Sequence, residues 1–204
     1  MRLAARVLVI TDPCGAVLDT TRAALSAARP GEAALIVRDK GAGARELAAL
    51  GRALLPLARA AGAPLLVNDR CDVARAIGAD GAHLPERGLR VADARAVLGP
   101  GALVGVSRHG PPREDEREDP PDYVTLGPVG PVEGKGSPLG LDGFAEAARA
   151  WPVPVYALGG VGVADVPELV ARGAAGVAVI RAVYAAADPA AALRALLDSR
   201  PRSA

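Results

Sequence analysis

Three cationic side chains, Arg38, Lys40 and Lys135, each follow an apolar segment with the composition of a buried β-strand. Arg38 and Lys40 come after AALIV at 33–37, and Lys135 lies in the loop-like stretch GPVGPVEGKGSPLG at 127–140. Like charges that gather without a counter-ion repel one another, so an anionic ligand is expected between them. Arginine offers phosphate a planar fork of donors, whereas lysine offers a point charge. For each residue alone, a solvated surface cation is the alternative.

The segment PLLVNDR at 64–70 ends in an amide, a carboxylate and a guanidinium directly after an apolar run. Burial of any of these groups without a partner is costly, so the polar triplet is expected where a strand opens into solvent or into a site. Asp69, beside Asn68, is a candidate Mg²⁺ ligand, because that ion is commonly held by one carboxylate together with ligand phosphates. Pairing of Asp69 with Arg70, or capping of the next helix by Asp69, explains the local sequence equally well.

Gly159 and Gly160, in LGGVGVADVPEL at 158–169, form a second candidate phosphate site. Glycine lets the main chain approach a ligand closely, and the helix expected next would direct its N–H groups and its positive dipole end toward the ligand. A plain turn is the alternative reading of this glycine pair.

Polar residues also follow two further apolar runs. Ser107 ends ALVGVS and is followed closely by His109, and Arg181 follows GVAVI. His109 is a candidate for ligand contact, because imidazole gains and loses a proton near neutral pH. The other histidine, His83, lies within an apolar run and is expected to be a hydrogen-bonded core residue.

Eight short apolar runs alternate with stretches in which apolar residues recur at helical spacing. Continuous apolar runs are typical of strands that are buried on both faces of a parallel sheet. Eight alternating units predict an α/β protein with a (β/α)8 TIM barrel fold, which binds ligands at the carboxyl ends of its strands. The runs lie at 5–11, 33–38, 64–68, 81–84, 102–107, 122–127, 153–159 and 176–180.

No linker or internal repeat divides the chain, so residues 1–204 are predicted to form one barrel domain. The fifth helical interval is short. GPPREDEREDPP at 110–121 has prolines at both ends, which leave at most two turns of charged residues. We expect a solvated, charged loop there in place of a full fifth helix.

The overall composition excludes several partners. Lys and Arg number 24 against 23 Asp and Glu, and this balance with few aromatic residues argues against nucleic acid and against a membrane surface. No apolar stretch approaches the ~20 residues of a membrane helix, and the first run has the character of a strand and not of a signal peptide. Cys14 and Cys71 form no disulfide or zinc pattern, which predicts a cytoplasmic protein. Assembly as a homo-oligomer is left open.

Six segments together resemble the thiamine phosphate synthase family and its relative, the TenI group of thiazole tautomerases. The resemblance covers nearly the whole chain and implies the same barrel fold. The segments are VRDK at 37–40, VNDRCDVARAIGADGAHL at 67–84, GVSRH at 105–109, DYVTLGPVGPVEGK at 122–135, PVYALGGV at 154–161 and GAAGVAVI at 173–180.

The resemblance implies a transferase that joins a hydroxymethylpyrimidine diphosphate to a thiazole phosphate with loss of pyrophosphate. In that family the diphosphate ionises, the thiazole nitrogen traps the pyrimidine cation, and Mg²⁺ with cationic side chains stabilises the leaving group. By position, the resemblance implies that Arg38, Lys40, Asn68 and Lys135 contact pyrophosphate, Asp69 binds Mg²⁺, Ser107 contacts substrate, and Gly160 with the main chain near Ile180 binds the thiazole phosphate.

Several positions depart from the family pattern. The family has glutamine, a second metal carboxylate, two threonines and a serine where this chain has Ile36, Gly88, Val132, Gly134 and Arg181. These losses weaken the expected Mg²⁺ site and count against synthase turnover. Glu86 is a nearby carboxylate that could take the place of the one missing at Gly88.

Three other functions stay open. One is a TenI-like tautomerase with His109 as its proton-transfer group, although the histidine that tautomerases carry after the sixth strand is Pro128 here. Another is a non-catalytic binder of thiazole or thiamine phosphate, which the retained Arg38, Lys40 and Lys135 would suit. The last is a barrel that acts on another phosphorylated substrate.

Overall fold

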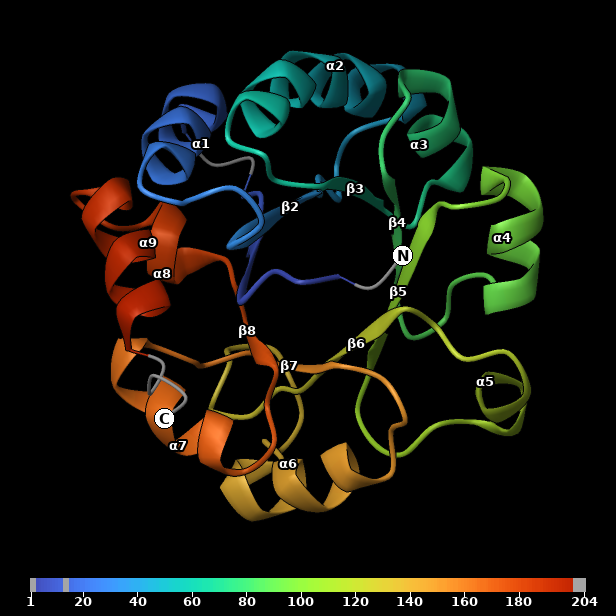
Figure 1. Cartoon of the computed structure of the whole chain (residues 1–204), viewed down its shortest axis with the longest axis vertical. Helices are drawn as coiled ribbons and strands as arrows, with labels where there is room; N and C mark the ends of the chain where they lie inside the picture. The colour runs from blue at the N-terminus through green and yellow to red at the C-terminus, as the bar shows by residue number, and fades with distance from the viewer. Residues whose placement is uncertain (1–2, 13–14, 200–204) are drawn as a thin grey trace.

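The computed structural model describes residues 3–12 and 15–199, and within them eight parallel strands close into one barrel. Figure 1 looks down this barrel and shows the helices in a ring around the strands. The predicted (β/α)8 TIM barrel is confirmed, and each strand overlaps one of the eight apolar runs. The strands are β1 (Val7–Ile10), β2 (Ala33–Val37), β3 (Leu65–Asn68), β4 (Gly81–Leu84), β5 (Leu103–Arg108), β6 (Tyr123–Leu126), β7 (Val155–Leu158) and β8 (Gly176–Val179).

The helices pack around the barrel through the apolar residues that recur along them. None of the helices in these described ranges has the length and hydropathy that a membrane span requires. The helices are α1 (Val17–Ser26), α2 (Ala44–Ala60), α3 (Cys71–Ile77), α4 (Val91–Leu98), α5 (Glu114–Glu118), α6 (Gly140–Arg149), α7 (Val166–Ala171), α8 (Arg181–Tyr184) and α9 (Pro189–Asp198), with a 3₁₀ turn η1 (Val163–Asp165) before α7.

The strands separate two apolar layers, because successive side chains point to opposite faces of a sheet. In β1, Val7 and Val9 pack in the larger cluster between the strands and the helices. Leu8 and Ile10 pack in the smaller cluster that fills the barrel interior. Both faces are therefore dry, which explains why the strands are continuously apolar instead of alternating.

The charged segment at 110–121 differs from the predicted solvated loop. It contains the short helix α5, and Glu116 within it is only 1% exposed. The Glu116 carboxylate pairs with the buried Arg108 guanidinium and also accepts the N–H of Arg113 at the start of the helix, at 2.9 Å. One buried acid thus orders a segment whose composition predicts a loop, while the flanking prolines keep the helix to five residues.

Candidate active site

Arg38 and Asn68 lie side by side at the carboxyl ends of neighbouring strands. The parallel register pairs Ile36 of β2 with Leu66 of β3, and both side chains belong to the cluster inside the barrel. Arg38 and Asn68 come two residues further along each strand, so they share the inward direction of that pair. The structure therefore brings a guanidinium-bearing residue and an amide together at the mouth of the barrel.

The main chain of Arg38 is held by Thr11, the residue that follows β1. Thr11 Oγ1 accepts the N–H of Arg38 at 2.7 Å and donates to the carbonyl oxygen of the same residue at 2.8 Å. Thr11 is fully buried, whereas Arg38 is partly exposed. A side-chain hydroxyl from one strand thus fixes the residue that leaves the next strand.

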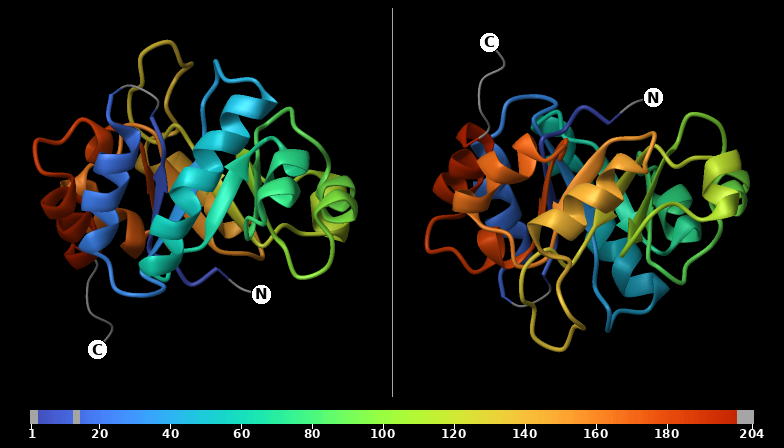
Figure 2. Two further views of the ribbon diagram at one scale, coloured as in Figure 1. Left: turned by 90° about the horizontal axis from the view of Figure 1, so that it is seen from above. Right: turned by 90° about the horizontal axis from the view of Figure 1, so that it is seen from below.

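Two loops at this end of the barrel carry the predicted lysines. Asp39 Oδ1 accepts hydrogen bonds from the N–H groups of the second and third residues after it, which shapes the loop that presents Lys40. Lys135 closes a turn in which its N–H donates to the Val132 carbonyl at 3.1 Å. Both lysines are exposed. Both views of Figure 2 show these loops, at 38–43 and 127–139, projecting from the end of the barrel opposite residues 3–6.

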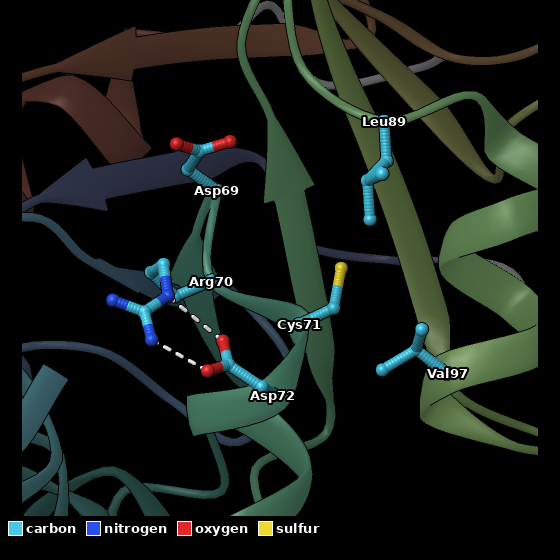
Figure 3. A pocket seen from close by; sticks show the side chains of 6 residues that line it. All are labelled: Asp69, Arg70, Cys71, Asp72, Leu89 and Val97. Carbon is cyan, nitrogen blue, oxygen red and sulfur yellow. Dashed lines mark hydrogen bonds and ion pairs between the residues drawn. The ribbon is translucent and has the colours of Figure 1, made fainter.

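Asp69 stands directly after β3 with a main-chain φ of 67°, a left-handed conformation that aspartate tolerates better than most residues. Its N–H donates to the His83 carbonyl of β4 at 2.9 Å, which fixes the turn. Arg70 does not pair with Asp69, because its guanidinium binds Asp72, with Nε 2.8 Å from Oδ1. The Asp69 side chain is exposed and points away from Arg70 and Asp72 (Figure 3). Pairing with Arg70 is therefore wrong, and no side chain caps α3.

A pocket of about 320 Å³ lies beside this turn, lined by Asp69, Arg70, Cys71, Asp72, Leu89 and Val97. In Figure 3 the Cys71 sulfur points toward the side of the pocket where Leu89 lies. Burial raises the pKa of the Cys71 thiol, with smaller contributions from nearby carboxylates. The only cation in this lining is already paired with Asp72, so the pocket does not have the character of an anion site.

Ser107 and His109 lie at the end of β5. The register pairs Ser107 with Thr125 of β6, and the Ser107 side chain is half-buried. His109 is exposed, and its Nδ1 donates to the carbonyl oxygen of Gly127, just after β6. That hydrogen bond fixes the imidazole against the loop that carries Lys135.

His83 is the centre of a buried polar group inside the barrel. Its Nδ1 lies 3.0 Å from the Tyr123 hydroxyl, and its Nε2 lies 3.3 Å from Thr125 Oγ1. Burial, together with the nearby positive charge of Arg108, lowers the pKa of His83 to about 3. The expectation of a hydrogen-bonded core histidine is confirmed, and His83 stays neutral near pH 7.

Gly159 and Gly160 are needed for close contact between two loops. Both have positive φ, 90° and 67°. The Gly130 N–H donates to the Gly159 carbonyl at 2.9 Å, and a Cβ on Gly160 would lie 2.7 Å from the carbonyl carbon of Gly130. The glycine pair is therefore more than a plain turn. Within the described residues, no hydrogen bond engages the Gly160 N–H, so this donor is available to a ligand.

Gly160 and Ile180 occupy equivalent positions on neighbouring strands. The register pairs Leu158 of β7 with Ala178 of β8, and Gly160 and Ile180 come two residues further on. Arg181 follows at the start of the short helix α8 and is exposed. The two main-chain segments predicted to bind one phosphate are thus adjacent.

The helix α7 contributes less to this phosphate site than the sequence predicts. The 3₁₀ turn η1 comes first, and α7 begins only at Val166 and has six residues. The Gly162 N–H already donates to Asp165 Oδ2 at 2.8 Å. Any phosphate held here would depend on the main chain near Gly160 and on neighbouring cations, because so short a helix offers little dipole.

All the predicted site residues thus lie at or beyond the carboxyl ends of their strands. Within residues 3–12 and 15–199, four cations of this end form no ion pair with an acid, namely Arg38, Lys40, Lys135 and Arg181, whereas Arg70 and Arg108 at the same end are paired. Unpaired cations at one end of a barrel create a positive potential that favours an anionic ligand.

Comparison with known proteins decides the family. A family model described as thiamine monophosphate synthase matches residues 7–183. The chain belongs to the thiamine monophosphate synthase family. Among its relatives, a thiamine-phosphate synthase of Roseiflexus castenholzii is 44% identical over 200 residues, which are 94% of this chain and 86% of the relative. A thiamine-phosphate synthase of Moorella thermoacetica is 39% identical over 195 residues, 94% of this chain and 93% of the relative.

A solved structure of the same family supports the fold. The thiamine phosphate pyrophosphorylase from Pyrococcus furiosus is similar with a TM-score of 0.85 and 30% sequence identity, covering 97% of this chain and 96% of that chain. The resemblance drawn from six segments of sequence is therefore confirmed over the whole barrel.

The donors available for Mg²⁺ are few. Among the described residues, no group of three or more His, Cys, Asp or Glu side chains is arranged to hold a metal ion. At Gly88, where the family has its second carboxylate, a Cβ would lie 2.8 Å from Cδ of Pro85, so the turn leaves little room for a side chain. Glu86, the suggested replacement, has its Oε1 paired with Arg113. Asp69 remains, and one carboxylate fits a Mg²⁺ ion that is also held by substrate phosphates.

Sequence reasoning missed two contacts that shape the site. From the sequence, Thr11 is only the end of a strand, Glu116 belongs to the charged loop at 110–121, and Arg108 follows the fifth apolar run with no assigned partner. The polar Thr-Asp pair directly after the first apolar run is the same signal that drew attention to Asn68 and Asp69. Nothing local distinguishes Glu116 from the acids around it.

Proposed function

We propose that this protein is a thiamine phosphate synthase, which joins a hydroxymethylpyrimidine diphosphate to a thiazole phosphate and releases pyrophosphate. The observation that carries the proposal is the group of Arg38, Lys40, Lys135 and Arg181, which lie beyond the carboxyl ends of their strands and have no ion-pair partner among the described residues of a chain of this family. Such an end suits a reaction between two phosphorylated substrates in which a diphosphate leaves.

Departure of pyrophosphate breaks the bond between the pyrimidine methylene carbon and the diphosphate oxygen, and the electron pair leaves with the oxygen. In the proposed arrangement Arg38, Lys40 and Lys135 stabilise the negative charge that grows on the leaving group, and the Asn68 amide donates to it. Ser107 contacts the substrate from the end of β5. The thiazole nitrogen then bonds to the carbon that the diphosphate has left.

The second substrate is assigned to another part of the same mouth. The free N–H of Gly160 and the main chain near Ile180 would hold the thiazole phosphate, with Arg181 as an additional cation in place of the family's serine. The two phosphate sites then lie on β2–β3 and on β7–β8, which the strand β1 separates on one side of the barrel.

Asp69 would hold Mg²⁺ together with oxygens of the diphosphate. When bound, the ion supplies positive charge where the leaving group gains electrons. The exposed Asp69 carboxylate and its fixed main chain fit this role. We further place the protein in the cytoplasm, on the reasoning from its two cysteines.

A coupled assay tests the proposal. The purified protein, supplied with pyrimidine diphosphate, thiazole phosphate and Mg²⁺, should release pyrophosphate and form thiamine phosphate. Chelation of Mg²⁺ and Asp69→Asn should each lower the rate by at least tenfold, whereas Asp72→Asn, which alters the neighbouring carboxylate paired with Arg70, should leave it within about twofold. Absence of product with both substrates and Mg²⁺ would reject the synthase, and melting shifts with thiamine phosphate would then support a binder.

A further inference from the structure

The hydroxyl of Thr11 occupies an unusual place in the site. Thr11 follows β1 on the face that packs against the helices, as Val7 and Val9 do, and it is 0% exposed. Its Oγ1 makes two hydrogen bonds, and both go to the main chain of Arg38 at the end of β2. The hydroxyl is therefore satisfied entirely by the residue that leaves the neighbouring strand.

These bonds continue the pairing of two strands beyond their regular ladder. The last main-chain bond between these strand ends is donated by the Thr11 N–H to the Ile36 carbonyl at 2.9 Å. The chain of β2 then turns outward into the loop of Lys40, and the N–H of Arg38 would have no strand partner. Thr11 Oγ1 supplies that partner from the layer behind the barrel wall, so the main chain of Arg38 is held where it leaves the strand.

We propose that Thr11 is a positioning residue for the reaction, which fixes the main chain of Arg38 and thereby the direction in which its guanidinium meets the diphosphate. The inference rests on the proposed function for the identity of that anion. Thr11 itself does not touch substrate in this arrangement. A guanidinium recognises phosphate through a planar fork of donors, so a small rotation of its main chain misaligns both donors together.

The chain offers a matched control. Thr21 of α1 is also 0% exposed, and its Oγ1 lies 2.6 Å from the Tyr184 hydroxyl of α8, so its partner is a side chain and not the main chain of Arg38. Thr11→Val and Thr21→Val each delete one buried hydroxyl with little change in shape. The two substitutions should lower the stability of the protein to urea by a similar amount. A difference between the kinetics of the two variants is then due to where the hydroxyl lies, and not to the general effect of removing a buried hydroxyl.

The test compares Thr11→Val, Thr11→Ser and Thr21→Val in the coupled assay. Thr11→Val should raise KM for the pyrimidine diphosphate about tenfold, a change that corresponds to the free energy of about one hydrogen bond. The KM for the thiazole phosphate should stay within about twofold of the wild-type value. Thr11→Ser, which keeps the hydroxyl, should restore the wild-type value. Thr21→Val should leave both constants unchanged. In an Arg38→Ala background, Thr11→Val should have no further effect, because it acts through the guanidinium.

Equal KM values for Thr11→Val and Thr21→Val, or a Thr11→Val effect that persists undiminished in the Arg38→Ala background, would overturn the inference. Calorimetry with inorganic pyrophosphate separates it from the proposed function. If the wild type binds pyrophosphate without turnover, the synthase proposal fails, and a roughly tenfold weaker affinity of Thr11→Val still supports the role of Thr11. If the wild type does not bind pyrophosphate, both proposals fail.

Discussion

Arg108 and Glu116 form an ion pair in which the side chains are only 5% and 2% exposed, with Nε 2.6 Å from Oε1. Arg108 also donates to the carbonyls of Pro85, at 3.3 Å, and of Ser107, at 2.7 Å. The pair therefore joins the end of β5, the loop after β4 and the helix α5. The hydrogen bond to its carbonyl oxygen holds the main chain of Ser107 at the end of β5.

Removal of one partner of this pair should destabilise the protein strongly. Glu116→Gln leaves the Arg108 charge buried without a counter-ion, and we expect a loss of about 3 kcal/mol in the free energy of unfolding. Urea denaturation measures it. Arg90→Ala is the control, because Arg90 forms an exposed ion pair with Asp115, which lies in α5 as Glu116 does. Loss of this exposed pair should lower the free energy of unfolding by at most about 1 kcal/mol. Equal losses for the two variants would contradict the assignment of a buried pair.

Arg38→Ala should lower kcat/KM for the pyrimidine diphosphate by at least tenfold, because the variant removes a fork of charged donors from the leaving group. Steady-state kinetics at fixed thiazole phosphate measure the effect. Arg38→Lys should recover only part of the activity, since a point charge does not replace the fork. The exposed Arg52 of α2 provides the control, and Arg52→Ala should behave as wild type. Unchanged kinetics for Arg38→Ala would remove Arg38 from the site.

The stability of the protein should decrease in acid partly through His83. Its pKa is lowered to about 3 in the folded protein, whereas imidazole in an unfolded chain has a pKa of about 6.5. Between these values the unfolded state binds one more proton, so stability falls as the pH falls, by up to ~1.4 kcal/mol per pH unit from this group. Above about pH 6.5 the contribution is complete and constant.

Urea titrations at pH 7, 6 and 5 check this pH dependence. His83→Asn should lose the corresponding slope and also some stability at pH 7, because Tyr123 and Thr125 lose their partner. His109→Asn, which removes the exposed histidine and keeps His83, is the matched variant for this comparison. A slope that survives in His83→Asn would show that other groups account for it.

Gly160→Ala should damage both stability and thiazole phosphate binding. The new Cβ would meet the Gly130 main chain at 2.7 Å in a residue with a φ of 67°, so the two loops must move apart. We expect a loss of about 2 kcal/mol and a weaker affinity for the thiazole phosphate, measured by denaturation and by calorimetry. Gly136→Ala is the control, because nothing lies within 4 Å of the Cβ that this substitution would add in the loop of Lys135. Similar behaviour of the two variants would contradict the packing argument.

The amino-acid sequence by itself determined the barrel and the end of it that carries the site. Continuous apolar runs require strands buried on both faces, and eight of them joined by helical stretches leave few arrangements other than a closed parallel sheet. In such a sheet all carboxyl ends meet at one rim, so residues as distant as Arg38 and Lys135 could be assigned to the same side before their positions were known.

Only the tertiary structure decided which polar groups are partners. Thr11 and Arg38 are 27 residues apart and meet because β1 and β2 are neighbours in a particular register. Glu116 is chemically the same as the acids beside it, and its burial depends on where the end of β5 places the Arg108 guanidinium. The Gly160 contact with Gly130 likewise joins two loops. Local composition records what a residue is able to do, whereas pairing and burial depend on neighbours that the chain brings together only on folding.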